Sequence, residues 1–354
     1  MAKKVLIVDD SALVRKQLTE MIETLGFEID IAKNGQEAVD KAVSTQYDVI
    51  TMDINMPVMD GIEAVRQIMQ KKPTAILMIS SLTTEDATIT MSALDLGAID
   101  YIAKPGTMNV GKSANREDIL EKVNSLSRIP SRRLRRQTAR PQTRERQRVR
   151  TEQSSVDNER SSKDIEKIIL IGSSTGGPGL IEQICSSLPA NYKYPILIVQ
   201  HMPEQFTKAF AERLNRASVV TVQETSQNME VIPGNVYVAR GGVHLNFAKK
   251  VSGKIVIREN KEKGDNFFQP SANDMMQSAL TVFNGIDVVG IILTGIGDDG
   301  ADAMVELKNA GAYTLGESEE SATVYGMPKE AFDRGGVMEQ LDFKQILKKI
   351  VTLK

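Results

Sequence analysis

The chain alternates short apolar runs with segments of helical periodicity, and it does so in two separate stretches. In residues 1 to about 125, five apolar runs such as KVLIVDD and DVITMD are each followed by a segment with apolar residues three to four positions apart. The alternation resumes near residue 165 with KIILIG, YPILIVQ, VVTVQE, NVYVAR and DVVGIILTG, and residues 241–260 have a hairpin pattern. Such alternation is typical of parallel sheets covered by helices on both faces. We therefore predict two α/β domains.

An arginine-rich segment separates the two stretches. Between Arg128 and Arg150 there are ten arginines and one acidic residue, Glu145, with almost no apolar periodicity. Such a segment cannot bury enough apolar surface to offset its ordering entropy. We predict a first domain at residues 1–125, a flexible linker at 126–164 and a second domain at 165–354. The linker is either a solvated spacer, a contact for an acidic surface, or a nucleic-acid contact; without a helix-turn-helix or aromatic platform, nucleic acid is not expected.

The composition excludes several classes of protein. Cys185 is the single cysteine and there are only two histidines, so an internal disulfide is excluded and a zinc site is not expected. No apolar run approaches the roughly 18 residues of a membrane span. The net charge of -2 does not suggest a polyanion-binding chain. We expect a cytoplasmic protein without membrane insertion.

Polar residues stand at the ends of four of the first five predicted strands. Asp9 and Asp10 end the first strand, Asp53 the third, Ser80 the fourth and Lys104 the fifth. Ligands of open parallel sheets bind at this edge, and converging carboxylates need a hard cation such as Mg²⁺. The lysine and the hydroxyl could hold phosphoryl oxygens, with Asp53 as the nucleophile that forms an aspartyl phosphate. Any one of these residues alone would more often be a solvated strand end.

These positions resemble the receiver domain of two-component response regulators. The matching residues are VDD at 8–10, MDINMPVMDG at 52–61, Ser80 and KP at 104–105. The resemblance implies a flavodoxin-like fold with a parallel five-stranded sheet in the order 2-1-3-4-5, and Asp53 as the phosphoacceptor. It implies that Mg²⁺ is held by Asp9, Asp10, Asp53 and the backbone carbonyl of Asn55. It also implies a switch made of Ser80, Lys104 and Tyr101.

The second domain opens with a glycine-rich loop, IGSSTGGPG at residues 171–179. A P-loop requires a lysine where Pro178 stands, and a dinucleotide fingerprint requires a glycine where Ser174 stands. Both phosphate-binding interpretations therefore fail. What remains is a set of hydroxyl groups at the amino end of a helix, where the helix dipole favours developing negative charge.

A serine nucleophile needs a base and an orienting acid, and two other strand ends supply candidates. His201 follows YPILIVQ, and Asp298 and Asp299 follow DVVGIILTG in a turn whose glycines would let backbone N–H groups approach an oxyanion. The alternatives are a helix-capping serine, a structural histidine and an ordinary GDDG turn. His244 competes as the base, although it lies within the predicted hairpin.

The second domain resembles the catalytic domain of the chemotaxis protein-glutamate methylesterases, the CheB family. The matching stretches are IGSSTGGP at 171–178, VQHMP at 199–203, LTGIGDDGA at 293–301 and YGMPKEA at 325–331. Receiver, linker and esterase in this order is the family's architecture, so the likeness covers nearly the whole chain. It implies a doubly wound, Rossmann-like α/β hydrolase domain in which Ser174 is the nucleophile, His201 the base and Asp299 the orienting acid. It also implies that the active-site and oxyanion loops contain Thr175, Ile296 and Gly297.

The resemblance implies a phosphorylation-activated esterase of chemotaxis adaptation. The substrates would be glutamate γ-methyl esters, and certain glutamines, on methyl-accepting chemotaxis receptors. The phosphodonor would be the chemotaxis histidine kinase; the receiver would need Mg²⁺, and the esterase chemistry no cofactor. The alternative is a receiver-controlled signalling adaptor that binds receptor arrays without esterase turnover.

Overall fold

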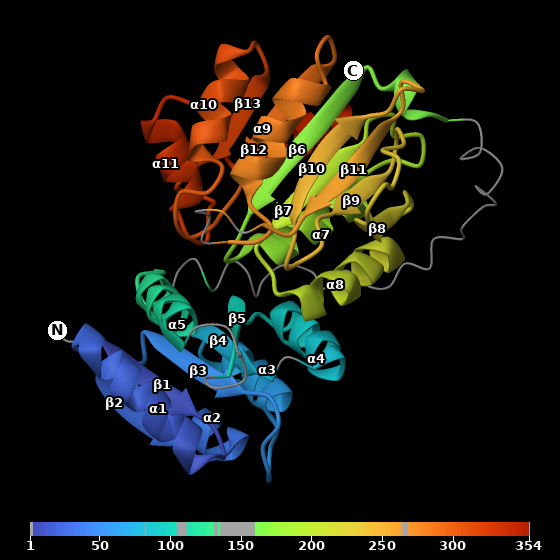
Figure 1. Cartoon of the computed structure of the whole chain (residues 1–354). Helices are drawn as coiled ribbons and strands as arrows, with labels where there is room; N and C mark the ends of the chain where they lie inside the picture. The colour runs from blue at the N-terminus through green and yellow to red at the C-terminus, as the bar shows by residue number, and fades with distance from the viewer. Residues whose placement is uncertain are drawn as a thin grey trace. The chain divides into compact units, whose positions relative to one another are not determined.

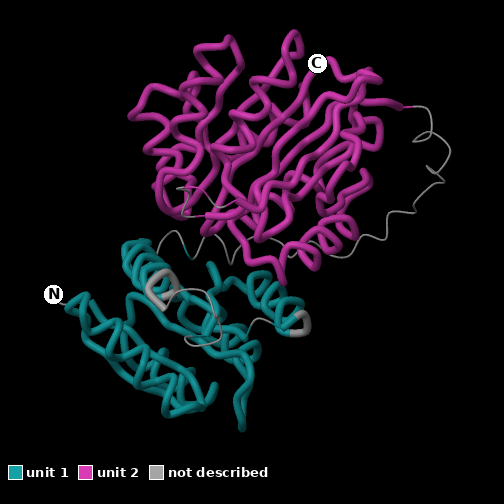
Figure 2. The backbone as a smooth tube through the Cα atoms, viewed as in Figure 1, with its two compact units in different colours: residues 1–144 teal, residues 145–354 magenta. Residues whose placement is uncertain are grey.

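The chain divides into two compact units, residues 1–144 and 145–354, which Figure 2 colours separately. The computed structural model describes residues 3–81, 83–104, 112–130, 134, 160–262, 264 and 268–353, without the side chains of residues 84, 85 and 112–115. Most of the predicted linker lies outside these residues, so the boundaries at 125 and 164 stay predictions. None of the described helices combines the length and apolar character needed to cross a membrane.

Unit 1 contains one parallel sheet. Its five strands lie in the order β2-β1-β3-β4-β5, as predicted (Figure 1). The central strands are buried along almost their whole length, because helices cover both faces, and this explains their continuous apolar runs. The strands are β1 (Lys4–Val8), β2 (Glu28–Ala32), β3 (Val49–Asp53), β4 (Ala75–Ser80) and β5 (Asp100–Ala103).

The helices of unit 1 start where the sequence supplies a capping side chain. Ser11, Asn34, Asp60 and Thr83 each accept a hydrogen bond from the backbone N–H three residues further on. Helix α1 contacts α5, whereas α2 contacts α3 and α3 contacts α4. The helices are α1 (Ala12–Ile22), α2 (Gly35–Ser44), α3 (Gly61–Lys71), α4 (Thr84–Asp95) and α5 (Lys112–Leu126).

Unit 2 contains a seven-stranded sheet in the order β14-β13-β12-β6-β7-β9-β8, with every neighbouring pair parallel. The predicted hairpin is also present, as the antiparallel pair β10 (His244–Lys249) and β11 (Ile255–Asn260). The doubly wound prediction is therefore confirmed. The sheet strands are β6 (Lys167–Ser173), β7 (Ile196–Gln200), β8 (Val222–Glu224), β9 (Val236–Val238), β12 (Asp287–Ile292), β13 (Tyr313–Glu317) and β14 (Glu339–Leu341).

The strand order of unit 2 reverses beside β6. From β6 the chain forms β7, β8 and β9 on one side, with β9 lying between β7 and β8, and it later places β12, β13 and β14 on the other side. In open α/β sheets, ligands bind outside the carboxyl ends of the strands at such a switch point. The functional site of unit 2 is therefore expected at the ends of β12, β6 and β7.

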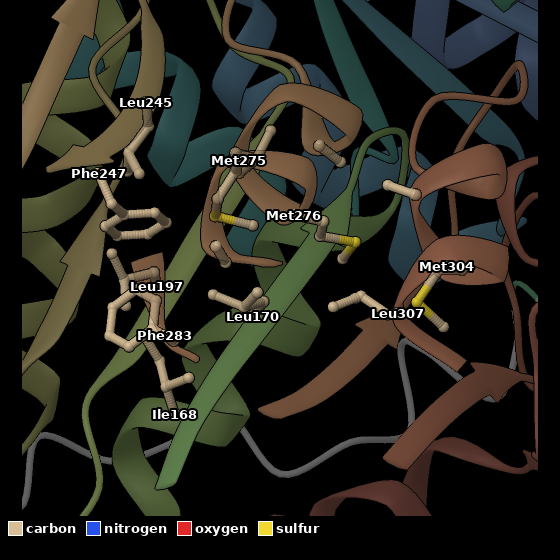
Figure 3. Close-up of a cluster of buried hydrophobic side chains, with 14 of the residues drawn as sticks. Ile168, Leu170, Leu197, Leu245, Phe247, Met275, Met276, Phe283, Met304 and Leu307 are labelled. Carbon is tan, nitrogen blue, oxygen red and sulfur yellow. The ribbon is translucent and has the colours of Figure 1, made fainter. Parts of the chain in front are cut away.

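Helix α9 is packed firmly against the strand at this switch point. Met275 and Met276 of α9 lie beside Leu170 of β6, and Met304 and Leu307 of α10 belong to the same buried cluster (Figure 3). This packing fixes the position of the α9 amino end relative to the end of β6. The helices are α7 (Gly177–Ser187), α8 (Glu204–Ala217), α9 (Ala272–Val282), α10 (Ala301–Asn309), α11 (Met327–Asp333) and α12 (Phe343–Thr352).

Candidate functional site

The carboxyl ends of β1 and β3 bring three carboxylates together in unit 1. Asp9 and Asp10 follow β1, Asp53 is the last residue of β3, and the two strands are paired. One oxygen from each carboxylate lies within 4.8 Å of the other two. Asp9 and Asp53 are buried, while Asp10 is exposed. A hard divalent cation such as Mg²⁺ fits this donor set, because clustered carboxylates repel one another unless a cation balances them.

Lys104 balances part of this negative charge. Its Nζ lies 2.8 Å from Oδ2 of Asp53 and 3.2 Å from Oδ2 of Asp9. Burial raises the pKa of Asp53 to about 6, since the hydrogen bond from Lys104 offsets the desolvation only in part and the charge of Asp9 adds to it. Burial alone would lower the pKa of Lys104, but its two carboxylate partners raise it. The lysine is therefore charged beside the predicted phosphoacceptor.

Ser80 and Asn55 have partners that the sequence did not predict. The Ser80 hydroxyl donates to the carbonyl oxygen of Ser81 at 3.0 Å and accepts from the Thr90 hydroxyl at 3.2 Å. The Asn55 side chain donates to Oδ1 of Asp86 at 3.1 Å. Both residues are thus tied to α4. The predicted role of the Asn55 carbonyl as a metal ligand stays a prediction.

Tyr101 lies in β5, paired with β4, and its side chain is buried. The Nζ atom of Lys122 lies 5.7 Å from the centre of its ring and donates to its backbone carbonyl at 2.9 Å. Burial raises the pKa of the phenol. The buried ring stands on the strand that leads to Lys104, whose neighbour Pro105 lies outside the described residues.

In unit 2, β6 leads into two serines with different surroundings. Ser173 ends the strand, and its hydroxyl donates to Oε1 of Gln200 at 2.8 Å. Ser174 comes next, and its backbone N–H donates to the carbonyl oxygen of Thr294 at 3.0 Å. Within the described parts of the chain, the Ser174 hydroxyl has no hydrogen-bond partner. Ser174 is therefore the serine whose hydroxyl is available for reaction.

The pairing of β6 with β7 brings His201 to the same place. Ser173 and Gln200 are paired in the sheet, so Ser174 and His201, which directly follow them, lie next to each other at the ends of two neighbouring strands. The N–H of His201 donates to the carbonyl oxygen of Ser173 at 3.0 Å. Nε2 of its ring lies 2.7 Å from Oδ2 of Asp299, which leaves Nδ1 as the ring atom that can accept a proton.

Asp299 is held by the amino end of α9. Its Oδ1 accepts from the hydroxyl of Ser271 at 2.7 Å and the N–H of Asn273 at 3.0 Å. Its Oδ2 accepts from the N–H of Ala272 at 2.6 Å as well as from His201. Burial alone would raise the pKa of Asp299, but these hydrogen bonds and the nearby imidazole lower it. The carboxylate is therefore charged and fixed in orientation.

Phe268 covers one face of the imidazole. The two ring centres are 3.9 Å apart, and the ring planes differ by 16°. A stacked aromatic ring restricts rotation of the histidine.

The loop after β12 passes very close to the nucleophile. A Cβ atom on Gly295 would lie 2.9 Å from Cβ of Ser174 and 2.3 Å from the sulfur of Met327, so any other residue here would force Ser174 or Met327 to shift. The next two N–H groups, of Ile296 and Gly297, have no acceptor among the residues that the structure describes. They are candidate oxyanion donors, and Gly297 has the left-handed φ of 80° that favours glycine.

Thr175 is tied to the same loop. It is buried, and its carbonyl oxygen accepts from the Thr294 hydroxyl at 2.9 Å. The N–H of Thr294 in turn donates to the buried carboxylate of Glu317 at 2.8 Å. A hydrogen bond thus joins the loop after β6, which contains Ser174 and Thr175, to the loop after β12, which contains Thr294.

His244, the alternative base, lies at the start of the hairpin and contacts Asp274. It is buried at the start of β10, and its Nδ1 lies 3.4 Å from Oδ2 of Asp274 in the first turn of α9. The geometry thus favours His201, whose ring is hydrogen-bonded to Asp299.

Four supporting residues of this site were not predicted from the sequence. Gln200 and Thr294 lie inside two of the quoted stretches, VQHMP and LTGIGDDGA, but no role was assigned to them. Ser271 carries the signal of a capping residue before a helix. The four are Gln200, Phe268, Ser271 and Thr294.

Both units match families of known proteins. The family described as CheB methylesterase matches residues 169–350, and the response regulator receiver domain matches residues 5–115. A protein-glutamate methylesterase/protein-glutamine glutaminase 2 of Carboxydothermus hydrogenoformans is 46% identical over 99% of this chain and 98% of its own. A protein-glutamate methylesterase/protein-glutamine glutaminase of Archaeoglobus fulgidus is 41% identical over 98% of this chain and 97% of its own.

A solved structure gives the same result for unit 2. The CheB methylesterase catalytic domain of Thermotoga maritima is 36% identical, with a TM-score of 0.51, and the match covers 53% of this chain and 98% of that one. The resemblance seen in the sequence is confirmed. The chain belongs to the CheB methylesterase family and carries a response regulator receiver domain ahead of the methylesterase domain.

Proposed function

We propose that this chain is a phosphorylation-activated serine hydrolase that removes γ-methyl esters from glutamates of chemoreceptors and deamidates receptor glutamines. One observation carries the proposal. Ser174, whose hydroxyl has no hydrogen-bond partner among the described residues, and His201 follow the ends of two paired strands. Nε2 of the His201 imidazole is hydrogen-bonded to Asp299. This is the arrangement of nucleophile, base and orienting acid that acyl transfer requires.

In the proposed first step, Oγ of Ser174 attacks the ester carbonyl carbon. Nδ1 of His201 takes the hydroxyl proton, and the charge of Asp299 stabilises the imidazolium that forms. The N–H groups of Ile296 and Gly297 would stabilise the negative oxygen of the tetrahedral intermediate. The intermediate collapses to a glutamyl ester of Ser174, and methanol leaves with the proton from His201.

In the second step, water attacks the acyl-enzyme. His201 takes a proton from the water and returns a proton to Ser174, which releases the glutamate carboxyl group. A glutamine side chain would follow the same course, with ammonia as the first leaving group. The charge on Asp299 supports both steps. Burial alone would raise its pKa, but the hydrogen bond and charge of His201 and the backbone N–H groups at the start of α9 lower it.

Unit 1 supplies the proposed control. Asp9, Asp10 and Asp53, with the carbonyl of Asn55, would hold Mg²⁺, which balances the carboxylates and the incoming phosphoryl charge. Asp53 would accept the phosphoryl group, and Lys104 would pair with its oxygens. Ser80, bonded to Thr90 of α4, and Tyr101 are the proposed switch residues.

The names of the relatives support the substrate class, and the receiver domain supports a histidine kinase as the phosphodonor. The proposed substrates are methyl-accepting chemotaxis receptors, and the proposed location is the cytoplasm.

Release of methanol from methyl-labelled receptor tests the proposal. The full chain is assayed with and without a small phosphodonor and Mg²⁺, beside Ser174→Ala and Asp53→Ala. We expect release that requires Ser174 and that the phosphodonor increases only when Asp53 is present. Equal background release from the wild type and Ser174→Ala would reject the esterase in favour of a signalling adaptor.

A further inference from the structure

Gln200 is a fully satisfied buried amide between the two reacting residues. Its side-chain nitrogen donates to the backbone carbonyl of Ser174 at 2.9 Å and to that of His201 at 3.2 Å. Its Oε1 accepts from the hydroxyl of Ser173 at 2.8 Å. The residue is 2% exposed. Both donors and one acceptor of the amide are therefore used inside the protein.

The position of Gln200 in the sheet explains what these bonds do. Backbone pairing between β6 and β7 ends with Ser173 and Gln200, and the last bond runs from the N–H of His201 to the carbonyl of Ser173. Beyond this point the two chains diverge into separate loops. The Gln200 amide donates hydrogen bonds to the backbone carbonyls of both Ser174 and His201. It therefore links the two segments one residue beyond the last backbone hydrogen bond of the sheet.

The space around this amide is closed. A Cβ atom on Gly177, the first residue of α7, would lie 2.3 Å from Oε1 of Gln200. The amide group therefore has a fixed place between the start of α7 and the β6–β7 pair.

We infer that Gln200 is a positioning residue that sets the distance between Ser174 and His201. The inference rests on the proposed function, since it assumes that these two residues exchange a proton. It does not require any particular ester. Errors of about 1 Å in the placement of reacting groups cost about 100-fold in rate.

The order of effects among substitutions follows from the hydrogen bonds. Gln200→Met keeps the length of the side chain but removes both donors. Gln200→Glu keeps an acceptor for Ser173 and carries at most one donor, when protonated. We expect the wild type to react about 10- to 100-fold faster than Gln200→Met, with Gln200→Glu between them.

The test is the rate at which a fluorophosphonate modifies the full chain. In this reaction Oγ of Ser174 forms a bond to phosphorus, fluoride leaves and His201 takes the proton, so the rate reports activation of the serine without a receptor substrate. Ile350→Val in α12, also buried, is the matched control for mild loss of packing. Each variant is assayed well below its thermal midpoint, and KM and kcat for methylated receptor are measured in parallel.

The expected result is slower modification in the order given, a fall in kcat with KM nearly unchanged, and a control that reacts like the wild type. If Gln200→Met and the wild type react at the same rate, the positioning role is overturned while the serine hydrolase stands. If the wild type is modified no faster than Ser174→Ala, the serine nucleophile itself is rejected, and the positioning role with it. If Gln200→Met does not fold, Gln200→Glu decides by the same criteria.

Discussion

Nε2 of His201 is bonded to Oδ2 of Asp299 at 2.7 Å, so the ring atom left to serve as the base is Nδ1. In the Ser-His-Asp arrangement of serine proteases, Nδ1 binds the aspartate and Nε2 takes the proton. In the proposed mechanism the two nitrogens of His201 exchange these roles. His201 directly follows the end of β7, which is paired with the strand that leads to Ser174. In that mechanism Nδ1 faces Ser174, while Nε2 remains bonded to Asp299.

Asp299→Asn tests this assignment. An asparagine amide that donates to Nε2 would force the ring proton onto Nδ1 and abolish the base. We expect kcat for methyl-ester hydrolysis to fall by about 1,000- to 10,000-fold, with KM little changed.

Asp298→Asn is the matched control for that variant. Asp298 is the neighbouring carboxylate of the same turn, but it is exposed and pairs with Arg334 at 2.5 Å. We expect its rate to stay within a few-fold of the wild type. Equal losses in the two variants would contradict the assignment of Asp299 as the orienting acid.

Gly295→Ala should disrupt the site sterically. The added methyl group would lie 2.3 Å from the sulfur of Met327 and 2.9 Å from Cβ of Ser174. We expect a loss of about 1–3 kcal/mol in the free energy of unfolding and a large fall in esterase activity. Thermal unfolding and methanol release measure the two effects.

Gly179→Ala is the control for this substitution. Gly179 lies in α7 just after the glycine-rich loop, and a Cβ atom added there would have no neighbouring atom within 4 Å. An alanine inside a helix is favoured over glycine by about 1 kcal/mol. We expect unchanged activity and equal or higher stability. A similar loss from both variants would show that the effect of Gly295→Ala does not come from its close contacts with Ser174 and Met327.

The positions of several candidate site residues were predictable from the sequence because strand ends mark them. Asp9, Asp53, Ser174 and His201 each end or follow an apolar run, and parallel strands deliver such ends to one edge. The strand order of unit 1 was likewise implied by the resemblance and is confirmed.

Other features depend on contacts between distant segments, and no local pattern reveals them. One such feature is which ring nitrogen of His201 binds Asp299. Another is the set of hydrogen bonds between Asp299 and the amino end of α9, where Ser271 lies 28 residues from Asp299. The predictions also omitted β13, β14 and α11. The three-residue β14 and the seven-residue α11 are too short for periodicity to stand out.

Asp53→Asn should stabilise unit 1 at high pH. The pKa of Asp53 is raised from 3.8 to about 6, chiefly by burial, so its ionisation opposes folding. The free energy of unfolding therefore falls by about 1–3 kcal/mol as pH rises from about 4 to about 6, and it stays lower above that pH. We expect Asp53→Asn to raise the unfolding midpoint at pH 8 and to have little effect at pH 4.

Mg²⁺ provides an independent check on the same cluster. A cation that binds only the folded state stabilises it, so added Mg²⁺ should raise the midpoint of the wild type and raise that of Asp53→Asn much less. Asp40→Asn, on an exposed position of α2, should respond to Mg²⁺ and pH like the wild type. An equal response of all three proteins to Mg²⁺ would rule out metal binding at Asp53.

The Glu230 carboxylate accepts hydrogen bonds both from Ser162, near the start of the described part of unit 2, and from Lys254 of the hairpin. Its Oε1 accepts from the N–H of Ser162 at 3.0 Å and from the Ser162 hydroxyl at 2.9 Å, and its Oε2 accepts from Lys254 at 2.7 Å. Burial would raise the pKa of Glu230, but these hydrogen bonds lower it to about 2. A lowered pKa means that the charged form stabilises the fold.

Glu230→Gln should therefore destabilise unit 2 near neutral pH. We expect a loss of about 1–3 kcal/mol at pH 7, measured by urea denaturation. Since the stabilisation exists above the unfolded pKa of 4.5 and disappears as pH falls toward about 2, the difference between variant and wild type should shrink over that range. Lys254→Met removes only the half-exposed ion pair and should cost about 0–1 kcal/mol. If Lys254→Met costs as much as Glu230→Gln, the ion pair and not the bonds to Ser162 holds this segment.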